Sequence, residues 1–273
     1  MQVHVIESKR GKEILLDVNL NSDANKPLVI FCHGFKGFKD WGPFNEVSNQ
    51  FVNAGLNFLK FNFSYNGVTV TDPHNFVDLE AFGNNNFSIE LEDLESVIDW
   101  AVTNLHNQVN IDQIYLMGHS RGGGISILKS SKNTRIKKVV SWASVSDFER
   151  RIKNDKLDVW KERGVAYVFN GRTNQQMPLY YQFYEDFMRN RDSLSIEKAS
   201  RSLNIPILIV HGTNDETVKF EEAEELHSWI DNSQLLKIEN CDHVFNAKHP
   251  FDSHNTPNEL KLAIDKSISF FIG

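Results

Sequence analysis

A serine framed by glycines is the residue in this sequence best suited to nucleophilic chemistry. Residues 118–124 read Gly-His-Ser-Arg-Gly-Gly-Gly and place Ser120 in the pattern G-x-S-x-G, directly after the apolar run 114–117. Where a strand turns sharply into a helix, glycines two residues away on each side remove side chains that would collide with the strained turn. The serine hydroxyl then projects over the sheet, and the helix N-terminus favours a developing negative charge. The pattern therefore predicts Ser120 as a nucleophile.

A serine hydroxyl is a poor nucleophile at neutral pH unless a base accepts its proton. The sequence offers a base and a group to orient it, because Asp215 follows the apolar run 207–210 and His243 follows the run 235–238. The chain order Ser120, Asp215, His243 is that of hydrolase catalytic triads in which each member follows its own strand. We therefore expect His243 to be the general base and Asp215 to hold it in place.

Acyl transfer by such a triad also needs hydrogen-bond donors for the oxyanion. His33-Gly34-Phe35 follows the apolar run 28–32, and the backbone N–H groups of Phe35 and Arg121 are the expected oxyanion hole. One such donor lowers the barrier by roughly 3–4 kcal/mol. His33 precedes the nucleophile in the chain and is interpreted as a structural hydrogen-bonding residue behind this loop.

Other reactive side chains fit the chemistry less well. Asp147 is an alternative acid because it follows the apolar run 139–143, but the loop around Asp215 carries the fuller motif. Cys32 and Cys241 are interpreted as small buried apolar groups, since two distant cysteines make neither a disulfide framework nor a zinc cluster. The ten histidines show no metal-ligand spacing, and the sequence has no glycine-rich nucleotide-binding loop. No metal and no cofactor are therefore expected.

The elements that must position these residues alternate along the chain. An opening hairpin and six later apolar runs are predicted strands, at residues 3–6, 14–20, 28–32, 56–63, 114–117, 139–143, 207–210 and 235–238. Apolar residues at helical spacing predict helices over residues 88–104, around 220–230 and from 257 onwards. Ser88 and Thr256 are the expected N-caps of the first and last of these helices. Strands that alternate with helices imply an α/β fold with a mostly parallel, eight-stranded sheet flanked by helices.

Residues 146–204 interrupt this alternation, because they contain no clear strand of the main sheet and are rich in aromatic side chains. They also predict a small hairpin whose first strand covers residues 165–169. We interpret the stretch as a small cap insertion within a single domain of residues 1–273. The alternative is that its aromatic side chains only fasten the insertion to the main domain. Three of them are the candidates for lining a substrate pocket: Tyr180, Tyr184 and Phe187.

Composition excludes several classes of partner. The 273 residues include 29 Lys+Arg and 36 Asp+Glu, for a net charge of -7, and the basic residues form no cluster. This balance argues against nucleic acid or an anionic membrane as the main partner. The apolar runs are too short to cross a bilayer, and charged residues occupy the N-terminal stretch where a signal peptide would be apolar, so a cytoplasmic protein is expected. The sequence leaves open whether the chain is a monomer or a homodimer.

Taken together, these motifs resemble those of the α/β-hydrolase superfamily. The similarity is to feruloyl and cinnamoyl esterases, and to the broader group of dienelactone hydrolases and prolyl oligopeptidases. It rests on four short motifs, at residues 33–35, 118–123, 211–215 and 242–243. The resemblance implies an α/β-hydrolase fold, with the family's triad and oxyanion donors at the positions given above and an insertion that covers the active site. Dienelactone hydrolases use a cysteine nucleophile, so Ser120 counts against that activity.

The expected function is hydrolysis of a small-molecule carboxylic ester with a small or aromatic acyl group, through an acyl-enzyme intermediate. Thioesters and amides are alternatives, because the same triad attacks any acyl carbonyl. A lipase is disfavoured by the lack of an H-G-G-G motif, and a peptidase by the lack of room for a propeller or a larger cap in 273 residues. The alternative from a different class is a hydrolase-fold ligand-binding protein without turnover.

Overall fold

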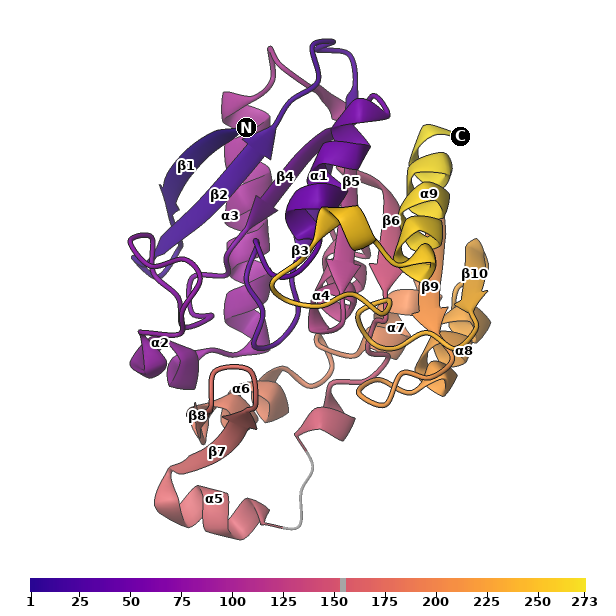
Figure 1. Ribbon diagram of the computed structural model, residues 1–273. Helices are drawn as coiled ribbons and strands as arrows, with labels where there is room; N and C mark the ends of the chain where they lie inside the picture. Colours follow the sequence, from indigo (N-terminus) through magenta and orange to yellow (C-terminus); the bar gives the residue numbers. More distant parts are fainter. Residues whose placement is uncertain (153–155) are drawn as a thin grey trace.

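The computed structural model of the protein describes residues 1–152 and 156–273, so residues 153–155 of the expected insertion lie outside the described residues. Within the described residues, eight strands form one sheet in the order β1-β2-β4-β3-β5-β6-β9-β10 (Figure 1). The strands are β1 (Gln2–Glu7), β2 (Glu13–Asn19), β3 (Pro27–Cys32), β4 (Asn57–Phe61), β5 (Asn110–His119), β6 (Ile136–Trp142), β9 (Ile207–Gly212) and β10 (Ser233–Ile238). β1 with β2 and β2 with β4 pair antiparallel, and the other neighbours pair parallel. The predicted mostly parallel, eight-stranded sheet is confirmed.

Helices cover both faces of this sheet (Figure 1). Those that pack on it are α1 (Phe44–Asn53), α3 (Phe87–Asn104), α4 (Arg121–Ser130), α8 (Phe220–Trp229) and α9 (Asn258–Ile272). α3, α4 and α8 share one layer of the core, and α1 and α9 share the other. Alternation along the strands explains the division: in β3, Leu28 and Ile30 belong to the first layer, whereas Val29 and Phe31 belong to the second. No helix within residues 1–152 and 156–273 is long and apolar enough to cross a membrane.

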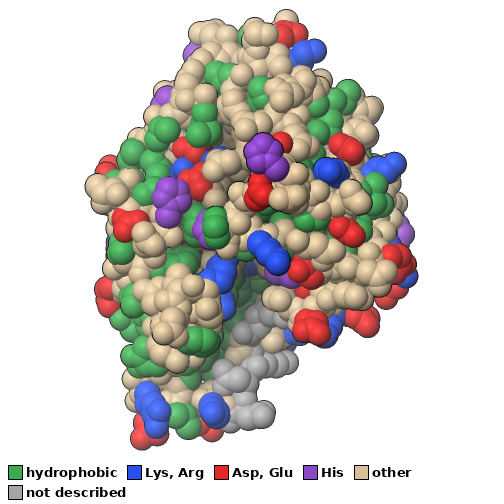
Figure 2. All heavy atoms as spheres, viewed as in Figure 1, with side chains coloured by type: hydrophobic (Ala, Val, Ile, Leu, Met, Phe, Trp, Pro, Cys, Tyr) green, Lys and Arg blue, Asp and Glu red, His purple; other side chains and the backbone are tan. Residues whose placement is uncertain are grey.

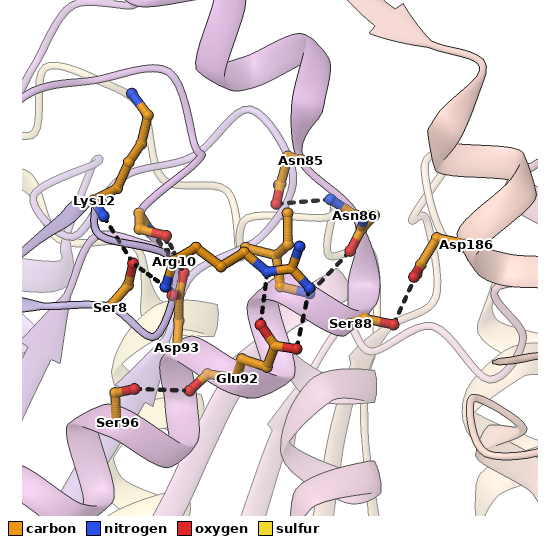
Figure 3. Close-up of polar contacts among 12 residues, drawn as sticks. Ser8, Arg10, Lys12, Asn85, Asn86, Ser88, Glu92, Asp93, Ser96 and Asp186 are labelled. Carbon is orange, nitrogen blue, oxygen red and sulfur yellow. Dashed lines mark hydrogen bonds and ion pairs between the residues drawn. The ribbon is translucent and has the colours of Figure 1, made fainter.

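Two helix starts differ from the predicted ones. The N-cap of α3 is Asn86, whose side chain accepts a backbone hydrogen bond from the first turn, rather than Ser88. Ser88 instead donates from Oγ to Asp186 of α6 (Gln182–Asn190) at 2.8 Å (Figure 3). α9 begins after Pro257 without a side-chain cap, and the Thr256 hydroxyl donates to a backbone carbonyl upstream. Asn and Ser are similarly good N-caps, so contacts from other parts of the fold decide between neighbouring candidates.

The chain between β6 and β9 builds a lobe beside the main sheet, which we call the β6–β9 segment (Figure 1). It begins with η1 (Glu149–Arg151) and α5 (Leu157–Arg163), continues through β7 (Val165–Asn170) and β8 (Gln175–Tyr180), and ends with α6 and α7 (Ile196–Arg201). β7 and β8 form an antiparallel pair separate from the main sheet, which confirms the predicted hairpin. The hairpin packs on α2 (Leu79–Asn84), where a Cβ added at Gly83 would lie 2.8 Å from the Tyr180 ring. A short 3-10 helix, η2 (Ser253–Asn255), precedes α9.

Candidate active site

Ser120 occupies a sharp turn between β5 and α4. Its backbone angles, φ 57° and ψ -122°, lie in a region that L residues rarely adopt, so the turn is strained. Two hydrogen bonds hold it there: the Ser120 N–H donates to the Trp142 carbonyl at 2.8 Å, and the Gly123 N–H donates to the Ser120 carbonyl at 3.0 Å. Gly122 lets α4 approach the chain after β3, because a Cβ at this position would lie 2.6 Å from the His33 carbonyl oxygen. The predicted strand-to-helix turn is therefore present, with the serine at its apex.

His243 and Asp215 are in contact at the end of neighbouring strands. Asp215 follows β9, His243 follows β10, and the His243 Nδ1–H donates to Asp215 Oδ2 at 2.7 Å. Asp215 is buried and also accepts hydrogen bonds at 2.8 Å from the N–H groups of Thr217 and Val218. Burial by itself would raise the pKa of Asp215, but the hydrogen bonds from His211 and His243 outweigh it and hold that pKa well below its usual range. The carboxylate is therefore ionised, and His243 Nε2 is left as the basic nitrogen.

A second histidine ties the loop that carries His243 to the nucleophile turn. His119, the residue before Ser120, donates through Nε2 to the His243 carbonyl oxygen at 2.9 Å, and the two rings lie 4.8 Å apart. Burial lowers the pKa of His119 to about 3, so this ring stays neutral. The structure thus gathers Ser120, Asp215 and His243 at one edge of the sheet. Within the described residues, the Ser120 hydroxyl makes no hydrogen bond to His243, a contact that often tightens only when substrate binds.

The expected oxyanion donors flank Ser120. The chain after β3 makes a turn that is closed by a hydrogen bond from the Gly37 N–H to the Gly34 carbonyl at 3.0 Å. This turn lies against the nucleophile, since a Cβ on Gly34 would be 2.9 Å from the Ser120 Cβ. In the part of the chain that the structure describes, the N–H groups of Phe35 and Arg121 have no acceptor. Both are therefore available to a substrate oxygen.

His33 supports this turn from behind. Its buried ring donates through Nδ1 to the Gly34 carbonyl at 2.9 Å and accepts at Nε2 from the Phe63 N–H at 3.3 Å. Both contacts together require a neutral ring, and burial lowers the pKa of His33 to about 4. This geometry fits the structural role that the sequence predicts for His33.

The Arg121 side chain makes contacts that the sequence reasoning missed. Its guanidinium lies 4.0 Å from the centre of the Phe35 ring and 5.0 Å from that of Phe87, and it donates to Glu90 Oε1 at 3.1 Å. Glu90 is buried and also accepts from the Asn85 amide at 2.8 Å. Burial raises the pKa of Glu90, and the Arg121 charge counters this only in part. The side chain of one expected oxyanion residue therefore packs on the ring of the other.

A buried charge cluster is made of Asp17, Lys39, Asp40 and Lys60. It anchors the chain that follows the turn at residues 34–37, which carries the expected oxyanion donor Phe35 and which we call the oxyanion turn. Lys39 Nζ lies 2.6 Å and Lys60 Nζ 2.5 Å from Asp17 Oδ2, and both lysines also contact Asp40. The four side chains are between 1% and 9% exposed. Because Asp17 comes from β2 and Lys60 from β4, the cluster fastens the oxyanion turn to the sheet. Nothing in the spacing of these residues indicates that they meet.

The three aromatic residues expected in a substrate pocket lie in different surroundings. Tyr180 donates from its hydroxyl to the Glu80 carboxylate of α2. Phe187 is buried in the core, with its ring 6.3 Å from that of Phe87. Tyr184 is partly buried and packs against the same core layer. The contacts of Tyr180 and Phe187 fasten the β6–β9 segment to the main domain, as in the alternative interpretation, and substrate contact by any of the three stays a prediction.

The remaining candidates from the sequence have other partners. Asp147 accepts from the Glu149 N–H at 2.7 Å and lies 3.6 Å from Arg150, so it is engaged away from His243. Cys32 and Cys241 are buried, and burial raises the pKa of both thiols to about 12, which suits small apolar groups. The described residues contain no group of three side chains placed to hold a metal ion.

The molecular surface is hollowed next to the β6–β9 segment (Figure 2). Figure 2 shows the hollow between the β6–β9 segment and the loop after β10, with hydrophobic side chains on its floor. Lys, Arg and His side chains gather at its rim (Figure 2). A concave, mostly apolar site with a few polar groups is what small-molecule binding requires.

Comparison with known proteins gives a family model, a curated relative and solved structures. The model of the prolyl oligopeptidase family matches residues 79–260. An uncharacterized 31.7 kDa protein from the traX-finO intergenic region of Escherichia coli is 32% identical over 123 residues, which cover 44% of this chain and 38% of that protein. The chain therefore spans about two fifths of the length of this curated relative.

Solved structures with the same fold include several hydrolases. Est1E from Butyrivibrio proteoclasticus with bound ferulic acid has a TM-score of 0.75 at 18% identity, with 98% of each chain covered. Dienelactone hydrolase from Anabaena variabilis has a TM-score of 0.63 at 14% identity, covering 99% of this chain and 97% of that one. At such identities the likeness shows the fold alone, which is the predicted α/β-hydrolase fold. Because the family model matches about two thirds of the residues, from α2 into α9, the chain belongs to the prolyl oligopeptidase family of α/β-hydrolases.

Proposed function

We propose that this protein is a serine hydrolase that cleaves carboxylic esters of small or aromatic acids through an acyl-enzyme intermediate. The observation that carries the proposal is the 2.7 Å contact of His243 with the ionised Asp215, tied through His119 to the strained turn that presents Ser120. Family membership supports the same reaction class.

The proposed reaction proceeds in two acyl-transfer steps. His243 Nε2 accepts the Ser120 proton while Oγ bonds to the ester carbonyl carbon, and the carbonyl oxygen becomes an oxyanion. The Phe35 and Arg121 N–H groups donate to that oxyanion, each contributing roughly 3–4 kcal/mol. The intermediate collapses as the alcohol leaves with the proton from His243. Water then attacks the acyl-enzyme in the same way and releases the acid, so no cofactor is needed.

The β6–β9 segment is proposed to act as the cap over the substrate. It stands beside the hollow and is rich in aromatic side chains, which favours apolar or aromatic acyl groups (Figure 2). The ferulic acid bound to Est1E, a protein of the same fold, supports an aromatic acid as one such group. The bound partner is thus proposed to be a small-molecule ester with a small or aromatic acyl group, with no role for nucleic acid or membrane.

A fluorophosphonate probe tests the nucleophile directly. The wild-type protein should be labelled covalently and should hydrolyse p-nitrophenyl esters, whereas Ser120→Ala should lose both properties. Labelling of Ser120→Ala at the wild-type rate would refute the assignment. A protein that binds ligand without turnover would show neither labelling nor hydrolysis, which separates that alternative class.

The acid of the triad is tested by a matched pair of substitutions. Asp215→Asn should lower kcat by about 10³- to 10⁴-fold, because the imidazole loses its orientation and the partner of its positive charge. Asp147→Asn, the same change at the alternative acid, should leave kcat near the wild-type value. The reverse result would show that Asp147, rather than Asp215, is the acid of the triad.

The family description makes peptide bonds the main alternative substrate. The same triad attacks amides, thioesters and esters, so the substrate class depends on the pocket rather than on Ser120. Comparing p-nitrophenyl esters of graded chain length and methyl ferulate with aminoacyl p-nitroanilides and acyl thioesters decides between them. A higher kcat/KM for the anilides than for every ester would show that the protein is a peptidase rather than an esterase.

A further inference from the structure

Two cationic side chains join the turn at residues 34–37 to the β7–β8 hairpin. Lys36, the residue after Phe35, donates from Nζ to the Phe169 carbonyl at 3.2 Å. Arg172, in the hairpin loop, donates from its guanidinium to the Lys36 carbonyl and lies over the Trp41 ring, 5.1 Å from the ring centre. These contacts join the main domain to the β6–β9 segment, and the Arg172 charge is close enough to lower the pKa of Lys36.

Neither charge is neutralised by the residues that the structure describes. Within residues 1–152 and 156–273, no carboxylate lies within ion-pair distance of Lys36 or Arg172. By contrast, Lys39 and Lys60 further along share two aspartates in the buried charge cluster. The Lys36 ammonium group and the Arg172 guanidinium each make one hydrogen bond here. Both groups therefore keep N–H donors that a ligand can use.

Holding these charges together is unfavourable in the free protein. Burial lowers the pKa of Lys36, and the Arg172 charge lowers it further, while burial also lowers the pKa of Arg172. Lys36 in addition has a positive φ of 55°, a conformation that favours glycine. An anion bound between the two groups relieves the repulsion, and an Arg fork beside a Lys ammonium suits a carboxylate.

Lys36 belongs to the turn that lies against the nucleophile. Lys36 follows directly on Phe35, the expected oxyanion donor, and the same turn lies against Ser120. Basic side chains are visible at the rim of the hollow in Figure 2. A substrate whose scissile carbonyl sits at Ser120 therefore lies against the turn that carries Lys36.

We propose that Lys36 and Arg172 bind a carboxylate on the substrate, so that the preferred esters are half-esters of dicarboxylic acids or esters of similar acids with a second anionic group. This inference rests on the proposed hydrolase function and refines its substrate class. It adds an anionic end to the small acyl group. The reaction at Ser120 is unchanged.

Two substrates of matched length test the proposal. Mono-p-nitrophenyl adipate and p-nitrophenyl hexanoate differ only in the terminal carboxylate, so the ratio of their kcat/KM values measures recognition of the charge. The wild-type ratio should exceed one and fall as salt is added, because screening weakens the attraction. Arg172→Gln and Lys36→Gln should each lower the ratio by about tenfold or more, the value of one charge-assisted hydrogen bond. The ratio cancels any general loss of activity from a loosened turn.

A control and a binding measurement make the outcomes distinct. Arg163→Gln removes the same charge from α5 of the same segment and should keep the wild-type ratio. A wild-type ratio below one, or a ratio unaffected by Arg172→Gln, would overturn the proposal. Monomethyl adipate should also bind Ser120→Ala by calorimetry, and adding Arg172→Gln should abolish binding. If no ester is hydrolysed but this Arg172-dependent binding is present, the anion site stands and the hydrolase function falls.

Discussion

The buried charge cluster offers the most direct test of how the oxyanion turn is held in place. Asp17 accepts from Lys39 at 2.6 Å and from Lys60 at 2.5 Å, and its side chain is 2% exposed. Asp17→Asn keeps the size and one acceptor oxygen but removes the charge. Two lysines then face Asp40 as their only remaining carboxylate within the described residues. The variant therefore leaves one positive charge buried without a partner.

The expected loss of unfolding free energy is large. Removing one member of a buried ion pair typically destabilises a protein by about 3–5 kcal/mol, because the remaining charge is kept from water. For a chain of this size, that loss corresponds to a fall in Tm on the order of 10 °C. Asp17→Asn combined with Lys60→Met removes one charge of each sign and should recover a large part of the loss, since no buried charge then remains uncompensated.

Urea unfolding followed by circular dichroism measures the effect, with Asp23→Asn as the matched control. Asp23 makes an exposed ion pair with Lys26 at 3.5 Å, so the same substitution there should leave the midpoint nearly unchanged. Similar midpoints for Asp17→Asn and Asp23→Asn would refute the reasoning. A double variant no more stable than Asp17→Asn would show that the loss does not come from the uncompensated charge.

Three further predictions concern the turn around the nucleophile. Gly122→Ala should lower the unfolding free energy by about 3 kcal/mol or more, because its Cβ would lie 2.6 Å from a backbone oxygen. Gly171→Ala is the control: its Cβ would have no neighbour nearer than 3.7 Å, so the same urea unfolding assay should show almost no change. Arg121→Met keeps the backbone N–H but loses the contact of the guanidinium with the Phe35 ring, so kcat should fall roughly 10- to 100-fold with little change in KM. An unchanged kcat would show that the Arg121 side chain does not position the oxyanion donors. His33 has a native pKa of about 4 against 6.5 when unfolded, so it binds fewer protons when native and stability is lost as pH falls through that window. Wild-type protein should lose up to about 1.4 kcal/mol per pH unit more than His33→Gln, and parallel curves of unfolding free energy against pH would contradict this.

Much of the fold follows from local patterns in the chain. Runs such as residues 28–32 and 207–210 are apolar throughout because their strands are buried on both faces, and this is why the parallel sheet is predictable. The nucleophile turn is equally local, since the glycines around Ser120 are required within a few residues of it. Asp215 and His243 are predictable because loops after parallel strands meet at one edge of the sheet.

The contacts around these residues depend on the packing of distant segments. Arg121 and Glu90 form a buried pair across two helices, and the pattern around Glu90 marks only the first turn of a helix. Asn86 rather than Ser88 caps α3, because Ser88 is engaged by Asp186 of the β6–β9 segment. Such pairings carry no signal in spacing or composition.

The sequence by itself determined the α/β architecture and the identity of the triad candidates, because periodicity, glycine placement and strand order act over short stretches of chain. Only the tertiary structure decided which side chains surround them. Separate segments are joined by the charge cluster of Asp17, Lys39, Asp40 and Lys60 and by the cationic side chains of Lys36 and Arg172. The physical reason is that burial and pairing set the energy of a charge, and both are properties of the packed chain rather than of any one segment.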